Sequence, residues 1–158
     1  MRKKIIAPTV TPPGSDNSSW LDLAQAVEEV EVSSEDAAYP VENALLPGIE
    51  AGWRAAGPGP QTIRLRFGQP RRLQRIVVEF AEKNLTRTQE FCLRWSADEG
   101  KTYREIVRQQ WNFSPDGASR EIEDYRIPLD GVTMLELEII PEIGGGDSVA
   151  SLARMRLA

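Results

Sequence analysis

The chain has 158 residues, 41% of them hydrophobic and 27% charged, which is ordinary for one globular domain and excludes disordered, collagen-like and membrane-spanning classes. Its net charge of −5 favours solubility and opposes general attraction to a polyanion such as nucleic acid. The sequence has no histidine, so it lacks the base of a Ser-His-Asp or Cys-His nucleophile and the usual imidazole metal ligand, and we predict no catalytic residue and no cofactor.

Residues 1–19 are predicted to be an extended leader that packs little, because Pro, Ser, Asn and Gly are frequent among them. Their first apolar run ends at Pro8, before the hydrophobic segment of a signal peptide is complete. The single cysteine, Cys92, has no partner for an internal disulfide, which fits a reducing compartment. We therefore expect a cytoplasmic protein in which residues 20–158 form one domain.

Between residues 20 and 30 the apolar positions fall near helical spacing, which predicts one short helix or helical turn. Ser19, followed three residues later by Asp22, is the predicted cap of this helix. The apolar positions are Trp20, Leu23, Ala24, Val27 and Val30.

From Gln61 onward apolar residues alternate with polar ones, which is the pattern of strands buried on one face. Clusters of Gly, Pro and Asp separate these segments and leave no room for crossover helices, so we expect antiparallel pairing. Two stacked sheets bury one face of each strand, and the predicted fold is an all-β antiparallel sandwich. The alternating segments are residues 63–67, 76–80, 91–95, 125–129, 135–139 and 153–157, and the turn signals are residues 57–60, 68–70, 98–100, 115–117, 130–131 and 144–146.

Several short motifs follow one another in a characteristic order over about residues 27–158. They are Val-Glu-Val-Ser-Ser at 30–34, Tyr-Pro-Val-Glu-Asn-Ala-Leu at 39–45, Gly-Trp-Arg at 52–54, a strand with its turn at 61–70, a Ser, Asp-Glu-Gly-Lys, Tyr hairpin at 93–103, and closing strands at 135–140 and 148–155. Together they resemble the discoidin family, also called the coagulation-factor C-type domain. The resemblance implies a jelly roll of the galactose-binding-domain type with ligand loops at one end. Members bind sugars, phospholipid surfaces, proteins or DNA, so the resemblance alone does not choose the ligand.

Sugar-binding members of that family often hold a calcium ion between an Asp-Gly turn and a carboxylate of the last strand. Here the turn reads Leu46-Pro47-Gly48 and the late position is Arg154. A hard cation needs several oxygen ligands, carboxylates included, so we predict no metal site.

The segment from Arg108 to Ser114 combines an arginine, amides and two aromatic rings, which are the groups of a sugar site. In this interpretation Trp111 stacks on a pyranose ring, and Arg108, Gln110 and Asn112 bind its hydroxyls. The alternative is a buried strand end with Trp111 and Phe113 in the core.

Further candidates lie in two other segments. Arg87 and Gln89 are similar in type to the preceding group, and Arg87 either pairs with Glu90 or holds a ligand carboxylate. Trp53 and Arg54 are predicted to flank the ligand, although a Trp at this place of the family more often packs under the loops. Trp95 shares the phase of Phe91 and Leu93 and is assigned to the core, and Cys92 is interpreted as an inert thiol.

Other functions are less well supported by the residues. Glu121 and Glu123 are interpreted as a solvated acidic strand edge rather than as a glycosidase pair. Membrane attachment would need Trp111 or Phe113 at a loop tip. A basic stretch is a candidate nucleic-acid stripe, but the acidic total and nearby glutamates argue against that partner. The stretch consists of Arg64, Arg66, Arg71, Arg72 and Arg75.

The sequence thus predicts a non-catalytic binding module that recognises a carbohydrate through loops at one end of the sandwich. The alternative is a protein-interaction or assembly domain whose sheet face or edge meets a partner chain.

Overall fold

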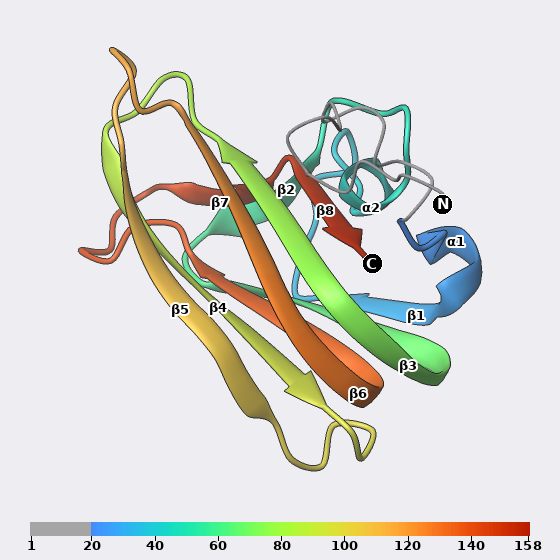
Figure 1. Cartoon of the computed structure of the whole chain (residues 1–158). Helices are drawn as coiled ribbons and strands as arrows, with labels where there is room; N and C mark the ends of the chain where they lie inside the picture. The colour runs from blue at the N-terminus through green and yellow to red at the C-terminus, as the bar shows by residue number, and fades with distance from the viewer. Residues whose placement is uncertain (1–19) are drawn as a thin grey trace, which may run out of the picture.

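The structure is a computed structural model that describes residues 20–158, so the predicted leader at 1–19 lies outside the described residues. Antiparallel strands dominate it, as Figure 1 shows, and the predicted all-β sandwich is confirmed. The elements are α1 (Leu23–Ala26), β1 (Val27–Val32), α2 (Glu42–Leu45), β2 (Trp53–Pro58), β3 (Gln61–Ala81), β4 (Arg87–Ser96), β5 (Arg104–Phe113), β6 (Arg120–Ile140), β7 (Val149–Leu152) and β8 (Arg154–Leu157).

Two long strands, β3 and β6, run through both layers of the sandwich. The first half of β3 and the last half of β6 lie in a layer of five strands, in the order β1-β3-β6-β4-β5. The other halves pair with each other and, through β3, with β8, which makes a second layer of three strands. β2 and β7 form a separate two-stranded sheet.

Contacts in the core show that the two layers face each other. The ring of Phe91 in β4 lies 5.1 Å from that of Phe80 in β3 and 6.5 Å from that of Tyr125 in β6, measured between centroids. One cluster of buried apolar residues extends from Leu23 to Leu157. Residues from both layers thus share a single core, as expected for a sandwich.

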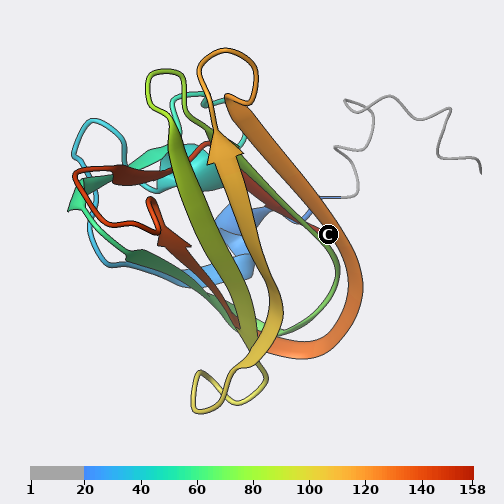
Figure 2. The same cartoon turned by 90° about the vertical axis from the view of Figure 1, so that its left-hand side faces the viewer.

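The predicted turns at residues 68–70 and 130–131 are bends within continuous strands. β3 and β6 stay paired through this region, with register shifts between Arg66 and Arg75 that allow the ribbon to fold over. Gly131 supports the bend with φ of +69°, which favours glycine. Figure 2 shows β6, in orange, curving from one layer into the other. The alternating segments were therefore located correctly, but two pairs of them each belong to one strand.

The first helix is shorter than predicted. α1 ends at Ala26, and from Val27 the chain pairs with β3, because the β-branched valines of this segment fit a sheet better than a helix. Asp22 caps α1, with its carboxylate accepting from the backbone N–H of Ala24 at 3.1 Å. The predicted cap, Ser19, lies outside the described residues.

The connections gather at two ends of the sandwich. Residues 82–86 and 114–119 lie at one end, and the β4–β5 hairpin at 97–103 lies at the other (Figure 1). Within the described chain no helix has the length and apolar character needed to cross a bilayer.

Candidate functional site

A polar cavity of about 340 Å³ lies at the end that carries the 82–86 loop. The segment before β2, the β3–β4 loop, the start of β6 and the β7–β8 junction meet there. The lining residues are Glu50, Ala51, Trp53, Arg54, Ala81, Glu82, Lys83, Asn84, Arg120, Ser151, Leu152 and Ala153. We refer to it as the loop-end cavity.

Glu82 is held in the wall of this cavity by the buried Arg87. Arg87 Nε donates to Glu82 Oε1 at 2.8 Å, and its Nη1 donates to the carbonyl of Pro141 at 2.7 Å. The backbone N–H of Asn84 donates to Glu82 Oε2 at 3.2 Å. Burial works to raise the pKa of Glu82, but the hydrogen bonds from Arg87 and Asn84 outweigh it, so the pKa lies below its ordinary value. Glu82 is therefore an ionised acceptor in a defined position.

The predicted pair of Arg87 with Glu90 is wrong. Residues three apart in a strand lie on opposite faces, so Arg87 points inward beside Gln89 while Glu90 points outward. Arg87 is 3% exposed, and its guanidinium also lies 4.7 Å from the centre of the Phe113 ring. Arg87 and Gln89 therefore lie beneath the cavity wall.

Arg54 reaches the cavity from β2, where its guanidinium lies 5.0 Å from the centre of the Tyr39 ring. Its neighbour Trp53 is 1% exposed and donates its indole N–H to the carbonyl of Ser34 at 3.2 Å. The core alternative for Trp53 is thus the one its packing supports. Gly52 has φ of +71°, and a Cβ there would lie 2.7 Å from the carbonyl oxygen of Leu152, so only glycine lets the chain pass.

The cavity carries charges of both signs. Arg120 is ion-paired with Glu79, and the basic Lys83 and Arg54 line the same hollow as the acceptors Glu82 and Glu50. Asn84 adds an amide with both donor and acceptor capacity. Such a wall offers directional hydrogen bonds to a ligand rich in hydroxyl groups.

The candidates on β5 do not join this cavity. Arg108 pairs with Glu90 at 3.0 Å and Glu105 at 3.1 Å, on the outer face of the five-stranded layer. Gln110 also donates to Glu90, at 3.2 Å, and Asn112 accepts from Thr88 at 2.7 Å on that face.

Trp111 points the other way on β5. It is half-buried, packs against the core and meets the Phe113 ring edge-on with centroids 6.4 Å apart. This packing supports the core alternative, and a stacking role for Trp111 stays a prediction. Because Phe113 is fully buried and Trp111 lies within β5, neither forms the exposed loop tip that membrane attachment would need.

The interpretation of Glu121 as a solvated edge residue is wrong. Its side chain is 1% exposed, whereas Ile122 is 58% exposed, because Glu121 and Glu123 share the inward phase of Tyr125 and Leu129. Burial, with a smaller effect of the Glu123 charge, raises the pKa of Glu121 to about 7. Glu121 and Tyr125 are four residues apart in one strand and therefore lie on the same face, and sequence reasoning missed this signal.

The basic stretch of β3 is divided by the bend. Arg64 lies in the five-stranded layer and pairs with Glu136 at 2.7 Å, whereas Arg75 lies in the three-stranded layer and pairs with Asp124 at 2.8 Å. These arginines therefore form no single stripe, which further weakens the nucleic-acid interpretation. Burial, followed by a hydrogen bond to Glu105, raises the pKa of Cys92 to about 11, which agrees with an inert thiol.

The residues that replace the family's calcium ligands do lie together. Leu46, Pro47, Gly48 and Arg154 line a second, mainly apolar cavity of about 500 Å³ between the two short helices and β8. The one carboxylate in its lining, Asp22, caps α1. A guanidinium and apolar side chains do not fit a calcium ion. Among residues 20–158 no group of three or more acidic or cysteine side chains is placed to hold a metal.

The loop-end cavity uses residues that sequence reasoning did not select, namely Glu50, Glu82, Lys83, Asn84, Arg120 and Ser151. Three of them, Glu-Lys-Asn at 82–84, belong to the loop between β3 and β4. Its role depends on segments that are separated by up to about a hundred positions in the chain and meet through strand pairing.

Several solved structures with the same fold are carbohydrate-binding modules. A family 32 module of Clostridium perfringens NanJ, solved with galactose, has a TM-score of 0.64 at 14% identity over 87% of this chain and 96% of that one. The family 32 module of AlyQ, solved with 4,5-unsaturated mannuronic acid, has a TM-score of 0.62 at 15% identity over 84% and 95%. A pectin-binding module has a TM-score of 0.61 at 15% identity over 83% and 89%.

No family model matches the sequence, and no curated protein resembles it closely enough to be matched. The similarity therefore establishes the fold, a jelly-roll sandwich of the discoidin and galactose-binding type, as the sequence motifs had predicted.

Proposed function

We propose that this domain is a non-catalytic carbohydrate-binding module whose ligand occupies the loop-end cavity. The observation that carries the proposal is the polar wall in which buried Arg87 fixes Glu82 as an acceptor. Support also comes from the fold, which is shared with modules solved with galactose and with a mannuronic acid. The prediction of a carbohydrate ligand made from the sequence agrees with both.

Each side chain of the wall has a role that its chemistry allows. Glu82 and Glu50 accept hydrogen bonds from sugar hydroxyls, and Arg54, Lys83 and Arg120 donate to them. Hydrogen bonds that involve a charged group contribute roughly 1.5–3 kcal/mol each, so a few suffice for a selective site. Because Glu82 is already held in position, binding costs little ordering of this side chain.

A glycan array, followed by calorimetry with the best ligand, tests the proposal. Asn84→Ala is expected to weaken binding roughly tenfold, because it removes an amide from the cavity wall without touching the core. Asn112→Ala is the matched control, since it makes the same change on the outer face of β5. Loss of binding in Asn112→Ala or Trp111→Ala, with Asn84→Ala unchanged, would place the site on β5 instead.

Protein interaction is the second candidate function. Exposed apolar side chains stand in loops near the cavity, with Leu85 50% exposed and Ile143 51% exposed. A pull-down that returns one stoichiometric protein, together with a silent glycan array, would favour this role. A cytoplasmic location stays a prediction from the sequence.

A further inference from the structure

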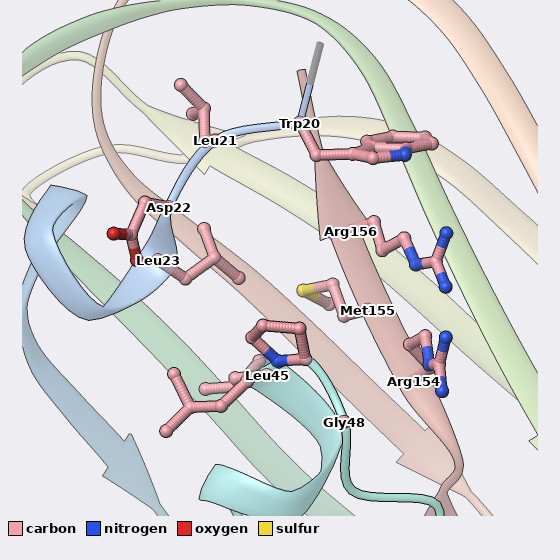
Figure 3. Close-up of a pocket in the computed structure, with 11 residues that line it drawn as sticks. Trp20, Leu21, Asp22, Leu23, Leu45, Gly48, Arg154, Met155 and Arg156 are labelled. Atoms are coloured by element: carbon pink, nitrogen blue, oxygen red, sulfur yellow. The ribbon is translucent and has the colours of Figure 1, made fainter. Parts of the chain in front are cut away.

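Two carboxylates are buried among residues 20–158, and they differ in their partners. Glu136 accepts hydrogen bonds from Arg64 and Arg94. Glu121 is 1% exposed, and neither of its oxygens has a hydrogen-bond partner within the described chain. Asp22, the carboxylate beside the apolar cavity in Figure 3, is exposed and caps α1. Because an ionised carboxylate that is buried without a partner disfavours the folded state, the place of Glu121 in the fold calls for an explanation.

A buried chain of polar groups connects Glu121 with the loop-end cavity. Gln89 is fully buried on β4, and its Oε1 accepts from Arg87 Nη1 at 3.2 Å. Arg87 Nε donates in turn to Glu82 Oε1 in the cavity wall at 2.8 Å. The other end of the Gln89 amide, Nε2, has no hydrogen-bond partner among the described residues, and the amide lies close enough to Glu121 to favour its ionised form. Glu121 therefore stands at the inner end of a chain that leads through Gln89 and Arg87 to Glu82.

Few ionisable groups face Glu121 from the elements packed around it. On its own strand Glu123 and Tyr125 share its inward phase, and the Tyr125 hydroxyl donates to Glu123 at 3.1 Å. Phe80 lies opposite Glu121 on β3, and the buried residues of β3 beyond the bend are apolar. β5 contributes aromatic rings to the core at this end, and β4 contributes Arg87 as its ionisable inward residue. Arg87 is therefore the cation on which the charge of Glu121 can act.

The proton of Glu121 is exchanged near neutral pH. Burial, with a smaller effect of the Glu123 charge, raises the pKa of Glu121 to about 7. When Glu121 is protonated, Glu82 is the one carboxylate on the chain that binds Arg87. When Glu121 is ionised, the Gln89 amide links a second anion to the same guanidinium, and the two carboxylates compete for one buried cation. Solvent screens buried charges little, so Glu82 is held less firmly when Glu121 is ionised.

We propose that Glu121 is a proton-operated control of the loop-end cavity, which acts through Gln89 and Arg87 on the position of Glu82. Its consequence for binding rests on the proposed function: carbohydrate is expected to bind roughly fivefold more tightly at pH 6 than at pH 8, at the low end of typical coupling between sites. By linkage, a bound sugar strengthens proton binding at Glu121 by the same factor. Glu121 is a positioning residue, because it lies beneath the cavity wall and is not among the residues that line it.

NMR of the full chain labelled with ¹⁵N and ¹³C tests the coupling without any sugar. The Arg87 Nε–H group is buried and donates to Glu82, so its signal reports on this pair. The signal is expected to shift with a midpoint near pH 7, and the shift is expected to vanish in Glu121→Gln. Glu123→Gln is the matched control on the same strand face. There the shift is expected to persist with a lower midpoint, because a charge that raises the pKa of Glu121 is gone.

Calorimetry with galactose at pH 6 and pH 8 measures the consequence for binding. The fivefold difference is expected in the unmodified chain and not in Glu121→Gln, and equal galactose affinities at the two pH values would overturn control of the cavity. If galactose binds at neither pH while the Arg87 signal titrates as expected, that result counts against the proposed function and not against the coupling.

An Arg87 signal that stays constant with pH, or that titrates equally in Glu121→Gln, overturns the proposal even if galactose binds. Gln89→Leu serves as a second variant if Glu121→Gln fails to fold. It removes the amide between the two ends of the chain, so the Glu121 carboxyl carbon is expected to titrate while the Arg87 signal stays constant. An Arg87 signal that still follows Glu121 in Gln89→Leu would contradict the assigned route.

Discussion

The two outer faces of the sandwich carry similar side chains but arrange them differently. On the five-stranded layer Glu136 accepts from Arg64 at 2.7 Å and from Arg94 at 2.8 Å, and Arg94 also reaches Glu138 at 3.2 Å. On the three-stranded layer Arg154 lies opposite Glu79, which pairs with Arg120, and Arg75 lies opposite Arg126. The comparison teaches that cross-strand register, as well as composition, decides which charges meet on a sheet face.

Register explains this difference directly. Arg64 lies opposite Glu136 between β3 and β6, and Arg94 lies opposite the same Glu136 between β4 and β6. On the other layer Arg75 lies opposite Arg126, so like charges meet across the strands. Opposite charges directly across a sheet stabilise it and like charges destabilise it, so the cross-strand pairs of Glu136 contribute to stability and the Arg75–Arg126 pair does not.

The largest expected effect concerns an unpaired carboxylate between the two layers. The pKa of Glu121 is about 7 in the folded protein, above the ordinary value of 4.5. The folded state therefore holds this proton more tightly, so the stability from Glu121 is complete below pH 4.5 and is lost as the pH rises to about 7. Glu121→Gln removes the charge and is expected to stabilise the protein at pH 8 by about 3 kcal/mol.

Urea denaturation at pH 4.5 and pH 8 measures this effect. Glu105→Gln is the control of opposite sign, because hydrogen bonds from Cys92 and Arg108 lower the pKa of Glu105. If Glu121→Gln and Glu105→Gln changed the free energy of unfolding equally at both pH values, the different surroundings of these two carboxylates would have no effect on stability.

The second largest expected effect concerns Glu136, the carboxylate shared by two arginines on the outer face of the five-stranded layer. Glu136 is 7% exposed and has two arginine partners, so Glu136→Gln leaves Arg64 and Arg94 without their shared carboxylate. We expect a loss of about 2 kcal/mol, below the sum of two charged hydrogen bonds because both arginines are partly exposed. Urea denaturation at pH 7 measures it. An unchanged unfolding free energy would show that the pairs on this face contribute nothing.

A smaller effect is expected at the edge of the same face. Arg108 is 41% exposed and pairs with Glu90 and Glu105, so solvent screens both interactions. Arg108→Gln is expected to lower the free energy of unfolding by less than Glu136→Gln does. The difference from Glu136→Gln, measured in the same experiment, sharpens the distinction between buried and exposed pairs. A cost equal to that of Glu136→Gln would contradict it.

The smallest effect separates the two faces. Arg154→Gln removes a charge that repels Arg156, so stability is expected to stay the same or rise by about 0.5 kcal/mol. Thermal unfolding at low salt, where repulsion is strongest, is the sensitive measurement. A loss of several kcal/mol would show that Arg154 has a structural role.

Local alternation predicted the strands well, because a strand that is buried on one face has an apolar side chain at every second position. The segments at 91–95 and 153–157 lie in β4 and β8 as expected. The same rule places Glu121 on the inward face with Tyr125. The interpretation as a solvated residue was wrong because it gave more weight to the charge of Glu121 than to its position in the alternation. The bends at 68–70 and 130–131 were read as turns, because Gly and Pro signal a change of direction and do not reveal whether the pairing continues.

The sequence by itself determined the antiparallel sandwich and the positions of its alternating segments, and it made nucleophilic chemistry through histidine impossible. These properties are local, because each follows from residue type or from spacing along a few positions. Only the tertiary structure decided that Arg87 meets Glu82, that residues 50, 51, 53, 54, 82–84, 120 and 151–153 share one cavity, and that Arg75 lies opposite Arg126. Those meetings depend on long-range strand register, in which a shift of one residue exchanges the two faces of every paired strand.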